Sequence, residues 1–224
     1  MAATNLAHEI SSHLLSKGLI PTQAWLQTFL TSQKPSIPLH AIKQTAFFRL
    51  TASDITHTLQ KSANTVFPDD IHNGQLRERR IAGPVVVQVL GVEDIGKSAW
   101  SQLEALEAEE RGETTKGREI IRVLPGEEGP ETTTQQSSGP HKLMMQDVQG
   151  VCVFGLELES VNGIGLGMNI GTKILLKDVV AARGLLLLEP SCVTVVGGKI
   201  EELHQAWKKG RKEALRAKAN AGND

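Results

Sequence analysis

The sequence predicts an α+β protein in which an N-terminal bundle of three to four helices packs on a five-stranded antiparallel β-barrel. Two observations predict this class. Amphipathic helical patterns run from Ala3 to Gln60, whereas the later part of the chain holds short apolar runs bounded by turn residues. Few helical patterns separate these runs, which favours a small closed barrel of the oligonucleotide/oligosaccharide-binding (OB) type.

The strand predictions centre on the segment Gly171–Gly198. A run such as Leu185–Leu188 has no polar alternation, which suits a strand covered on both faces. We interpret Asp178–Gly184 and Glu189-Pro190 as the turns between the strands of this segment. The prediction of about five strands draws on six apolar segments, which are Pro84–Gly91, His141–Val148, Val151–Leu158, Ile174–Leu176, Leu185–Leu188 and Val193–Val196.

Each predicted helix of the N-terminal bundle is amphipathic and too short to be stable alone, so it must pack on another element. Pro21-Thr22 opens the second of these helices. A last helix, Lys199–Lys218, follows the barrel and carries Leu203 and Trp207 on one face. We expect that face to pack on the barrel or on the bundle.

Three segments follow from these patterns: a helical bundle over residues 1–66, a barrel over 67–198, and a C-terminal helix with a basic tail over 199–224. A long insertion, 97–140, interrupts the barrel between its first and second strands. It begins with a helix that has Ser98 as its N-terminal cap, and one side of this helix is acidic. The rest is a polar arm with one apolar island, which resembles a docking segment; a disordered insertion without a role is the alternative.

Composition limits the function classes. The formal net charge of the 224 residues is -1, which argues against autonomous DNA binding by a basic surface. The two cysteines, Cys152 and Cys192, lie inside apolar strands, and we expect both to be reduced thiols. No apolar run approaches the roughly 20 residues of a membrane helix, and the N-terminus lacks a signal-peptide pattern. We therefore expect a soluble, intracellular protein without membrane contact.

No catalytic or metal-binding constellation is found in the sequence. The glycines of Gly163–Gly167 lack the dinucleotide-binding spacing, and Thr172-Lys173 reverses the order of a phosphate-binding loop. The seven histidines are scattered, without a zinc-binding spacing. The sequence therefore predicts a non-enzyme with no catalytic residue, no metal and no cofactor.

Two basic clusters are candidate nucleic-acid contacts. The first lies in the connector before the barrel and the second in the last helix. A solvated surface is the alternative for the first, and the dipole at a helix C-terminus accounts for part of the second. The residues are Arg77, Arg79 and Arg80 in the connector, and Lys208, Lys209, Arg211 and Lys212 in the helix.

The segment Leu185-Leu186-Leu187-Leu188-Glu189-Pro190, followed by Val193–Gly198 and an amphipathic helix, resembles the N-terminal region of the RecQ-mediated genome instability protein 1 (Rmi) family. Gly171–Ile174 fits the family strand that precedes it, and Asp94–Leu103 resembles the family's entry into a long insertion. The likeness extends over nearly the whole chain, and it is to the short, fungal-type form of the family.

The resemblance implies a non-catalytic, nuclear subunit of a complex with a type IA topoisomerase (topoisomerase III) and a RecQ-family helicase. Such complexes dissolve double Holliday junctions during DNA repair, recombination and replication. The barrel would dock on the topoisomerase, and the insertion would reach its gate. The residues expected to contact the partner are Trp100, Leu103, Leu106, Ile120, Ile121, Val123 and Leu124 in the insertion, and Glu189 and Pro190 in the barrel turn.

One residue departs from the family pattern. Many relatives carry a lysine before the proline of this turn, whereas this chain has Glu189, so a basic contact is not carried over. An alternative function is an autonomous single-stranded nucleic-acid-binding OB module, which the fold permits. A third is an inert scaffold. The near-neutral charge, and Phe154 as the one aromatic residue of the predicted strands, favour the protein-binding function, with DNA bound weakly or through the complex.

Overall fold

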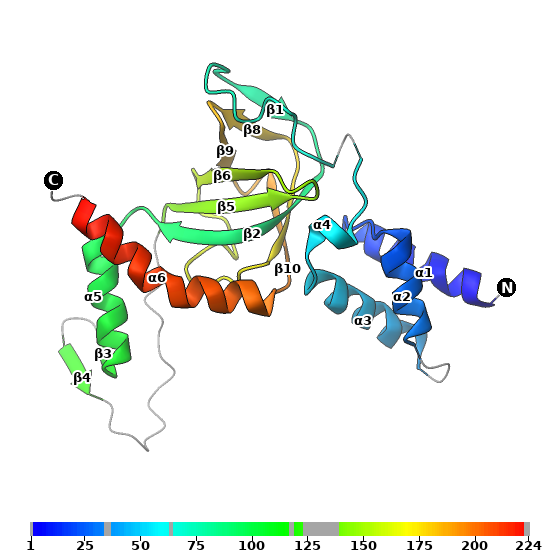
Figure 1. Cartoon of the computed structure of the whole chain (residues 1–224), viewed down its shortest axis with the longest axis horizontal. Helices are drawn as coiled ribbons and strands as arrows, with labels where there is room; N and C mark the ends of the chain where they lie inside the picture. The colour runs from blue at the N-terminus through cyan, green and yellow to red at the C-terminus, as the bar shows by residue number, and fades with distance from the viewer. Residues whose placement is uncertain (1, 34–36, 63–64, 117–118, 123–138, 222–224) are drawn as a thin grey trace.

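The computed structural model describes residues 2–33, 37–62, 65–116, 119–122 and 139–221 (Figure 1). Its helices are α1 Ala2–Ser16, α2 Gln23–Thr31, α3 Leu39–Thr51, α4 Ile55–Thr58, α5 Ala99–Glu110 and α6 Glu201–Ala221. Its strands are β1 Arg79–Ile81, β2 Val85–Asp94, β3 Glu113–Lys116, β4 Glu119–Arg122, β5 His141–Asp147, β6 Cys152–Glu157, β7 Lys173–Leu176, β8 Val179–Ala182, β9 Leu185–Leu188 and β10 Val193–Gly197.

Among the described residues, eight strands form one curved half-barrel sheet in the order β1-β8-β9-β6-β5-β2-β7-β10. The predicted α+β class, the OB-type barrel and the C-terminal helix are confirmed, but the prediction of five strands was wrong. The prediction that all strands are antiparallel was also wrong, because β6 and β9 pair in parallel. A separate hairpin, β3–β4, lies in the insertion.

The extra strands arise from bends that the sequence pattern presented as turns. Only Lys177 and Asp178 separate β7 from β8, and Asp178 adopts the left-handed conformation (φ 55°) that redirects the chain. The pattern Val179–Ala182 alternates buried and half-buried residues, as a strand does. The sequence of this part of the predicted connector, two valines followed by two alanines, carries no such alternation. The three residues of β1 are too few for a pattern, and β1 is defined by its pairing with β8.

The N-terminal helices and the barrel share a core. Buried apolar side chains of α1 to α4 cluster with Val86 of β2 and Val148, and half-buried Leu175 and Val196 pack against the same cluster. Thr22 caps α2, its hydroxyl oxygen accepting the Trp25 amide at 3.3 Å. The helices are therefore built onto one side of the barrel, as expected from their short length.

Helix α6 runs along the lower edge of the sheet in Figure 1, and α5 crosses the C-terminal half of α6. Half-buried Leu203 and Trp207 pack against the barrel core. His204 is buried, its Nδ1 accepts the amide of Ile170 at 3.2 Å, and burial lowers its imidazole pKa. No helix in the described part of the chain combines the length and apolar character that a membrane span requires.

Candidate functional site

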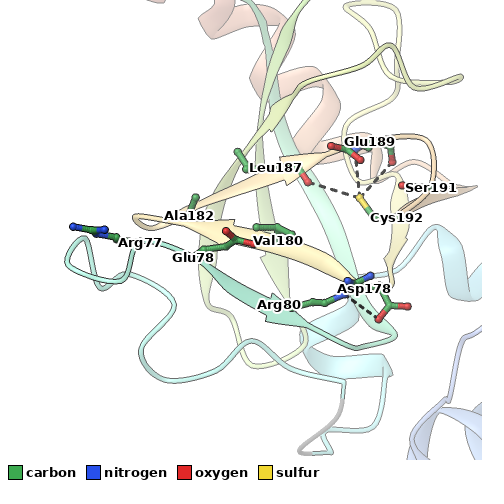
Figure 2. A pocket seen from close by; sticks show the side chains of 10 residues that line it. All are labelled: Arg77, Glu78, Arg80, Asp178, Val180, Ala182, Leu187, Glu189, Ser191 and Cys192. Atoms are coloured by element: carbon green, nitrogen blue, oxygen red, sulfur yellow. Dashed lines mark hydrogen bonds and ion pairs between the residues drawn. The ribbon is translucent and has the colours of Figure 1, made fainter.

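A pocket of about 390 Å³ lies on the outer face of β8 and β9 (Figure 2). Its floor is apolar, and charged side chains surround it. The connector before β1 supplies one wall, and the turn between β9 and β10 supplies the other. The lining residues are Arg77, Glu78, Arg80, Asp178, Val180, Ala182, Leu187, Glu189, Ser191 and Cys192.

Strand register sets the arginine side of the pocket. Arg80 of β1 pairs with Val180 of β8, so both side chains lie on the outer face, whereas Ile81 is buried against Val179. The Arg80 Nε atom lies 3.6 Å from a carboxylate oxygen of Asp178 (Figure 2). This ion pair is exposed, so it is weak and exchangeable.

The turn Glu189–Cys192 is held by a buried thiol. The Cys192 Sγ atom lies 3.3 Å from the Glu189 amide, which donates to it, and 3.3 Å from the Glu189 carbonyl oxygen. The Cys192 amide donates to the same carbonyl at 3.1 Å. These contacts fix the backbone of the turn, so half-buried Glu189 borders the pocket, while Pro190 and Ser191 are exposed.

The pocket joins candidate residues that the sequence presented as separate. Arg77 and Arg80 from the basic connector lie around one cavity with Glu189 from the barrel turn. Arg79 does not line it and instead pairs with Asp70. Val180, Ala182 and Leu187 form an apolar floor. The rim carries charges of both signs, from Arg77, Glu78, Arg80, Asp178 and Glu189. This arrangement suits a protein partner with complementary charges, because the partner would displace water from the floor while the charged rim selects its orientation.

The insertion leaves and re-enters the barrel at one point. The amide of Ile95 donates to the Pro140 carbonyl at 3.0 Å. Beside it, the Nδ1 atom of buried His141 lies 2.5 Å from Oε2 of buried Glu157, which also accepts the His141 amide at 3.1 Å. The start of α5 is fixed by Gln102, whose Nε2 donates to the Asp94 carbonyl at 2.8 Å. The insertion therefore has a well-anchored root.

The predicted contact residues of the insertion differ in accessibility. Trp100 on α5 has an exposed fraction of 66%, Leu106 is half-buried, and Leu103 is buried within this chain. Ile120 and Ile121 belong to β4, opposite β3. The predicted contacts Val123 and Leu124 lie outside the described residues. Trp100 is thus the described side chain of this set that is free to meet a partner.

The basic end of α6 meets the acidic side of α5. Arg216 Nη2 lies 2.7 Å from Glu107, and Lys212 pairs with both Glu107 and Glu110. Hydrogen bonding from Arg216 lowers the pKa of the Glu107 carboxyl. Among the other candidate nucleic-acid contacts of α6, Lys208 and Lys209 are exposed and Arg211 is half-buried on the Trp207 ring. In the described residues, no group of three or more His, Cys, Asp or Glu is arranged to hold a metal ion.

Two family models match this fold. One, described as the RMI1 N-terminal OB-fold domain, matches residues 67–211, which is more than half of the chain. The other, the RMI1 N-terminal helical domain, matches residues 14–58. The chain belongs to the RMI1 family. The resemblance inferred from the sequence is confirmed.

Individual RMI1 relatives agree with this assignment. The chain is 32% identical over 216 residues to RecQ-mediated genome instability protein 1 of Schizosaccharomyces pombe, covering 88% of this chain and 90% of that protein. It is 29% identical over 150 residues to the Mus musculus protein of the same name, but covers 23% of that protein's length. Tudor domain-containing protein 3 of Danio rerio is 24% identical over 169 residues, with 19% of its length covered.

The RMI1 OB-fold match includes every element that builds the pocket, the start of α5 and the first half of α6. Sequence reasoning missed that the arginine cluster and the Glu189 turn are neighbours. Their adjacency follows from the β1–β8 pairing, and β1 had no pattern of its own. The exposed outer face of β5, β6 and β9 was also missed, although Phe154 stood out as an aromatic residue between inward-facing neighbours.

Proposed function

We propose that this chain is a non-catalytic subunit of a nuclear complex with a RecQ-family helicase and a type IA topoisomerase, topoisomerase III. In this complex it promotes dissolution of double Holliday junctions and so genome stability. The observation that carries the proposal is the match of both RMI1 models, together with near-complete coverage of the fission-yeast relative named for RecQ-mediated genome instability.

The pocket-centred surface is the proposed topoisomerase contact. It presents Arg77 and Arg80 opposite Glu189 over an apolar floor. Because the charges are of both signs, the partner segment must offer a carboxylate to the arginines and a cation to Glu189. Glu189 therefore keeps a charged contact at the position where many relatives carry a lysine, but with the opposite sign.

The insertion is the proposed modulator of the topoisomerase gate. Its root is fixed by Gln102, by the Ile95–Pro140 hydrogen bond and by the buried His141–Glu157 pair. A fixed root lets the arm act at a defined place on the partner, because the point where the arm leaves the barrel is set before binding. Exposed Trp100 is the proposed anchor nearest the root.

Autonomous single-strand binding is less well supported. Of the α6 cations, Lys212 and Arg216 pair with carboxylates of α5, which reduces the positive charge that this helix offers to phosphate, and Lys208 and Lys209 are exposed. The formal net charge of -1 supplies no general attraction for phosphate. We therefore assign DNA contacts to the complex rather than to this chain alone.

Charge reversal tests the docking surface. Arg80→Glu and Glu189→Arg should each weaken co-purification with the cognate topoisomerase III by about tenfold, because each brings like charges together at the contact. Lys209→Glu, an exposed site on α6, is the matched control and should bind as the unmodified chain does. Unchanged binding by both pocket variants, with unchanged melting temperature, would refute this surface as the contact.

Replacing residues 113–138 with a short Gly/Ser linker tests the insertion. The root residues stay in place, so the barrel should remain folded and still bind the topoisomerase. Decatenation and double-junction dissolution by the complex should fall, because the arm no longer acts on the gate. Full dissolution activity would contradict gate control, and lost binding would make the arm the main docking element.

A further inference from the structure

A row of exposed apolar side chains crosses the outer face of the sheet at Met144, Phe154 and Leu185, with exposed fractions of 38%, 41% and 39%. Met144 of β5 is opposite Phe154 of β6, and Phe154 is opposite Leu185 of β9. Residues opposite one another on neighbouring strands share a face, so the three form one continuous strip. We call it the outer apolar row.

Both ends of the outer apolar row continue into other features. At one end Met144 is opposite Gly91, where a Cβ atom would lie 3.7 Å from the indole of Trp207 on α6. At the other end Leu185 is opposite Ala182, which lines the pocket. From Gly91 on β2 to Ala182 on β8 the face crosses four strand spacings of about 4.8 Å, roughly 19 Å in total. This is the length of about 13 residues of α-helix.

Positive charge borders the row on its α6 side. The Lys142 Nζ atom lies 4.9 Å from the centroid of the Phe154 ring, and Arg211 lies over an aromatic ring of α6 at 5.4 Å. Glu93 is shared between Lys142 at 3.1 Å and Lys218 at 2.7 Å. Glu109 and Asp94 act electrostatically on Arg211, whereas Lys142 and Lys218 share the single carboxylate of Glu93, so the excess of positive charge beside the apolar strip lies at these two lysines.

The chemistry of the row favours a protein segment over a single-stranded nucleic acid. Single strands stack successive bases on exposed aromatic rings, and the row offers one such ring, Phe154, between two aliphatic side chains. An amphipathic helix instead buries aliphatic and aromatic side chains along one face. Carboxylates on the rim of such a helix would complement the cationic border.

We propose that the outer apolar row docks an acidic, amphipathic helix of a partner protein. Apolar residues of the helix cover Met144, Phe154 and Leu185, and its carboxylates face Lys142 and Arg211. The site adjoins the pocket at Ala182 and shares strand β9 with it, but different side chains form it, so it serves a second contact beyond the topoisomerase contact proposed above.

Labelled peptides of about 16 residues test this site, with leucines at helical spacing and either glutamate or lysine at the remaining positions. In fluorescence anisotropy the glutamate peptide should bind the full chain, and the lysine peptide should bind at least about tenfold more weakly. Phe154→Ala should weaken binding of the glutamate peptide by about tenfold. Lys142→Glu should reverse the preference, so that the lysine peptide binds more tightly than the glutamate peptide. In the unmodified chain, the Met144 methyl NMR signal should shift on titration.

Phe48→Ala is the matched control, because Phe48 on α3 is exposed at 72% and remote from the row in sequence and element. It should leave peptide binding unchanged, and Phe154→Ala should leave topoisomerase co-purification unchanged. Equal binding of the two peptides, or an unmoved Met144 signal, would overturn the proposal. The proposal would also be overturned, in favour of nucleic acid, if an oligothymidylate of about 20 nucleotides bound more tightly than the glutamate peptide and Phe154→Ala abolished that binding.

Discussion

At the scale of single residues, Lys173 is a cationic side chain in a fully buried position. It is fully buried at the start of β7, its Nζ donates to the Gly171 carbonyl at 2.7 Å, and burial lowers its pKa to about 8, with Asp54 opposing the shift. The neighbouring network is polar: buried Gln88 donates to Asp54 at 3.0 Å and to Gln146 at 2.9 Å. This polar joint lies between the helices and the barrel.

Lys173→Met should remove a specific pH dependence of stability. Between about pH 8 and 10.5 the unfolded lysine keeps its proton while the folded one has lost it, so the unfolded state binds more protons and stability rises with pH. From about pH 7 to 10 the unfolding free energy of the unmodified chain should therefore gain about 1–3 kcal/mol relative to the variant.

Urea denaturation at several pH values measures this difference. The comparison cancels the contributions of other groups, such as Cys152, whose thiol pKa is raised by burial in both proteins. Parallel stability curves for the two proteins would contradict the assigned state of Lys173.

At the scale of elements, exposed ion pairs join α5 to α6, and we call this arrangement the clasp. Leu103 and Leu215 are the buried apolar residues of the two helices. Arg216 and Lys212 reach across to Glu107. Exposed pairs are individually weak and are screened by salt, so this clasp holds the insertion root in a releasable way.

Glu107→Lys should loosen α5 from α6. The substitution sets like charges against Lys212 and Arg216, so amide hydrogen exchange in α5 should quicken. Adding Arg216→Glu to this variant should restore part of the amide protection in α5, because the introduced lysine and the introduced glutamate would then pair with the charges exchanged. Glu104→Lys, on an exposed position of the same helix, is the control.

The same exchange measurement at high salt gives an independent check. The unmodified chain should approach the exchange rate of Glu107→Lys as salt screens the pairs. If salt and charge reversal both leave α5 protection unchanged, packing rather than charge holds the clasp. Since the pKa of Glu107 is lowered in the folded chain, its stabilising effect should be lost as pH falls through that lowered value.

At the scale of the whole molecule, the helical bundle, the barrel and the last helix converge at Gly198. Both Gly197 and Gly198 have φ of +100°, a conformation that favours glycine. A Cβ atom at Gly198 would lie 2.4 Å from the Thr51 carbonyl oxygen at the end of α3, whereas one at Gly197 would meet nothing within 4 Å. The Gly198 carbonyl also accepts the Thr172 hydroxyl at 3.1 Å.

Gly198→Ala should therefore destabilise the chain more than Gly197→Ala. Both substitutions carry a left-handed backbone cost of about 1–2 kcal/mol, and the clash with Thr51 should add about 1–3 kcal/mol at Gly198 alone. Chemical denaturation followed by fluorescence measures both losses. Equal losses would show that α3 moves freely away from the barrel.

The sequence by itself determined the elements with strong local patterns. The amphipathic helices, the long strand near Val85–Asp94 and the capped start of α5 follow from apolar spacing and from Ser98, which are local properties of the chain. The resemblance carried by Leu185–Gly198 was also sufficient to give the family.

Tertiary structure alone decided the strand count and the site. β1 and β8 are short, and they become strands because each supplies the other's hydrogen bonds. That pairing brings Arg77 and Arg80 to Glu189, residues distant in the chain. Likewise, the parallel pairing of β6 with β9 sets Phe154 beside Leu185 and creates the outer apolar row. No local pattern encodes such neighbours, because strand register depends on how the whole sheet closes around its core.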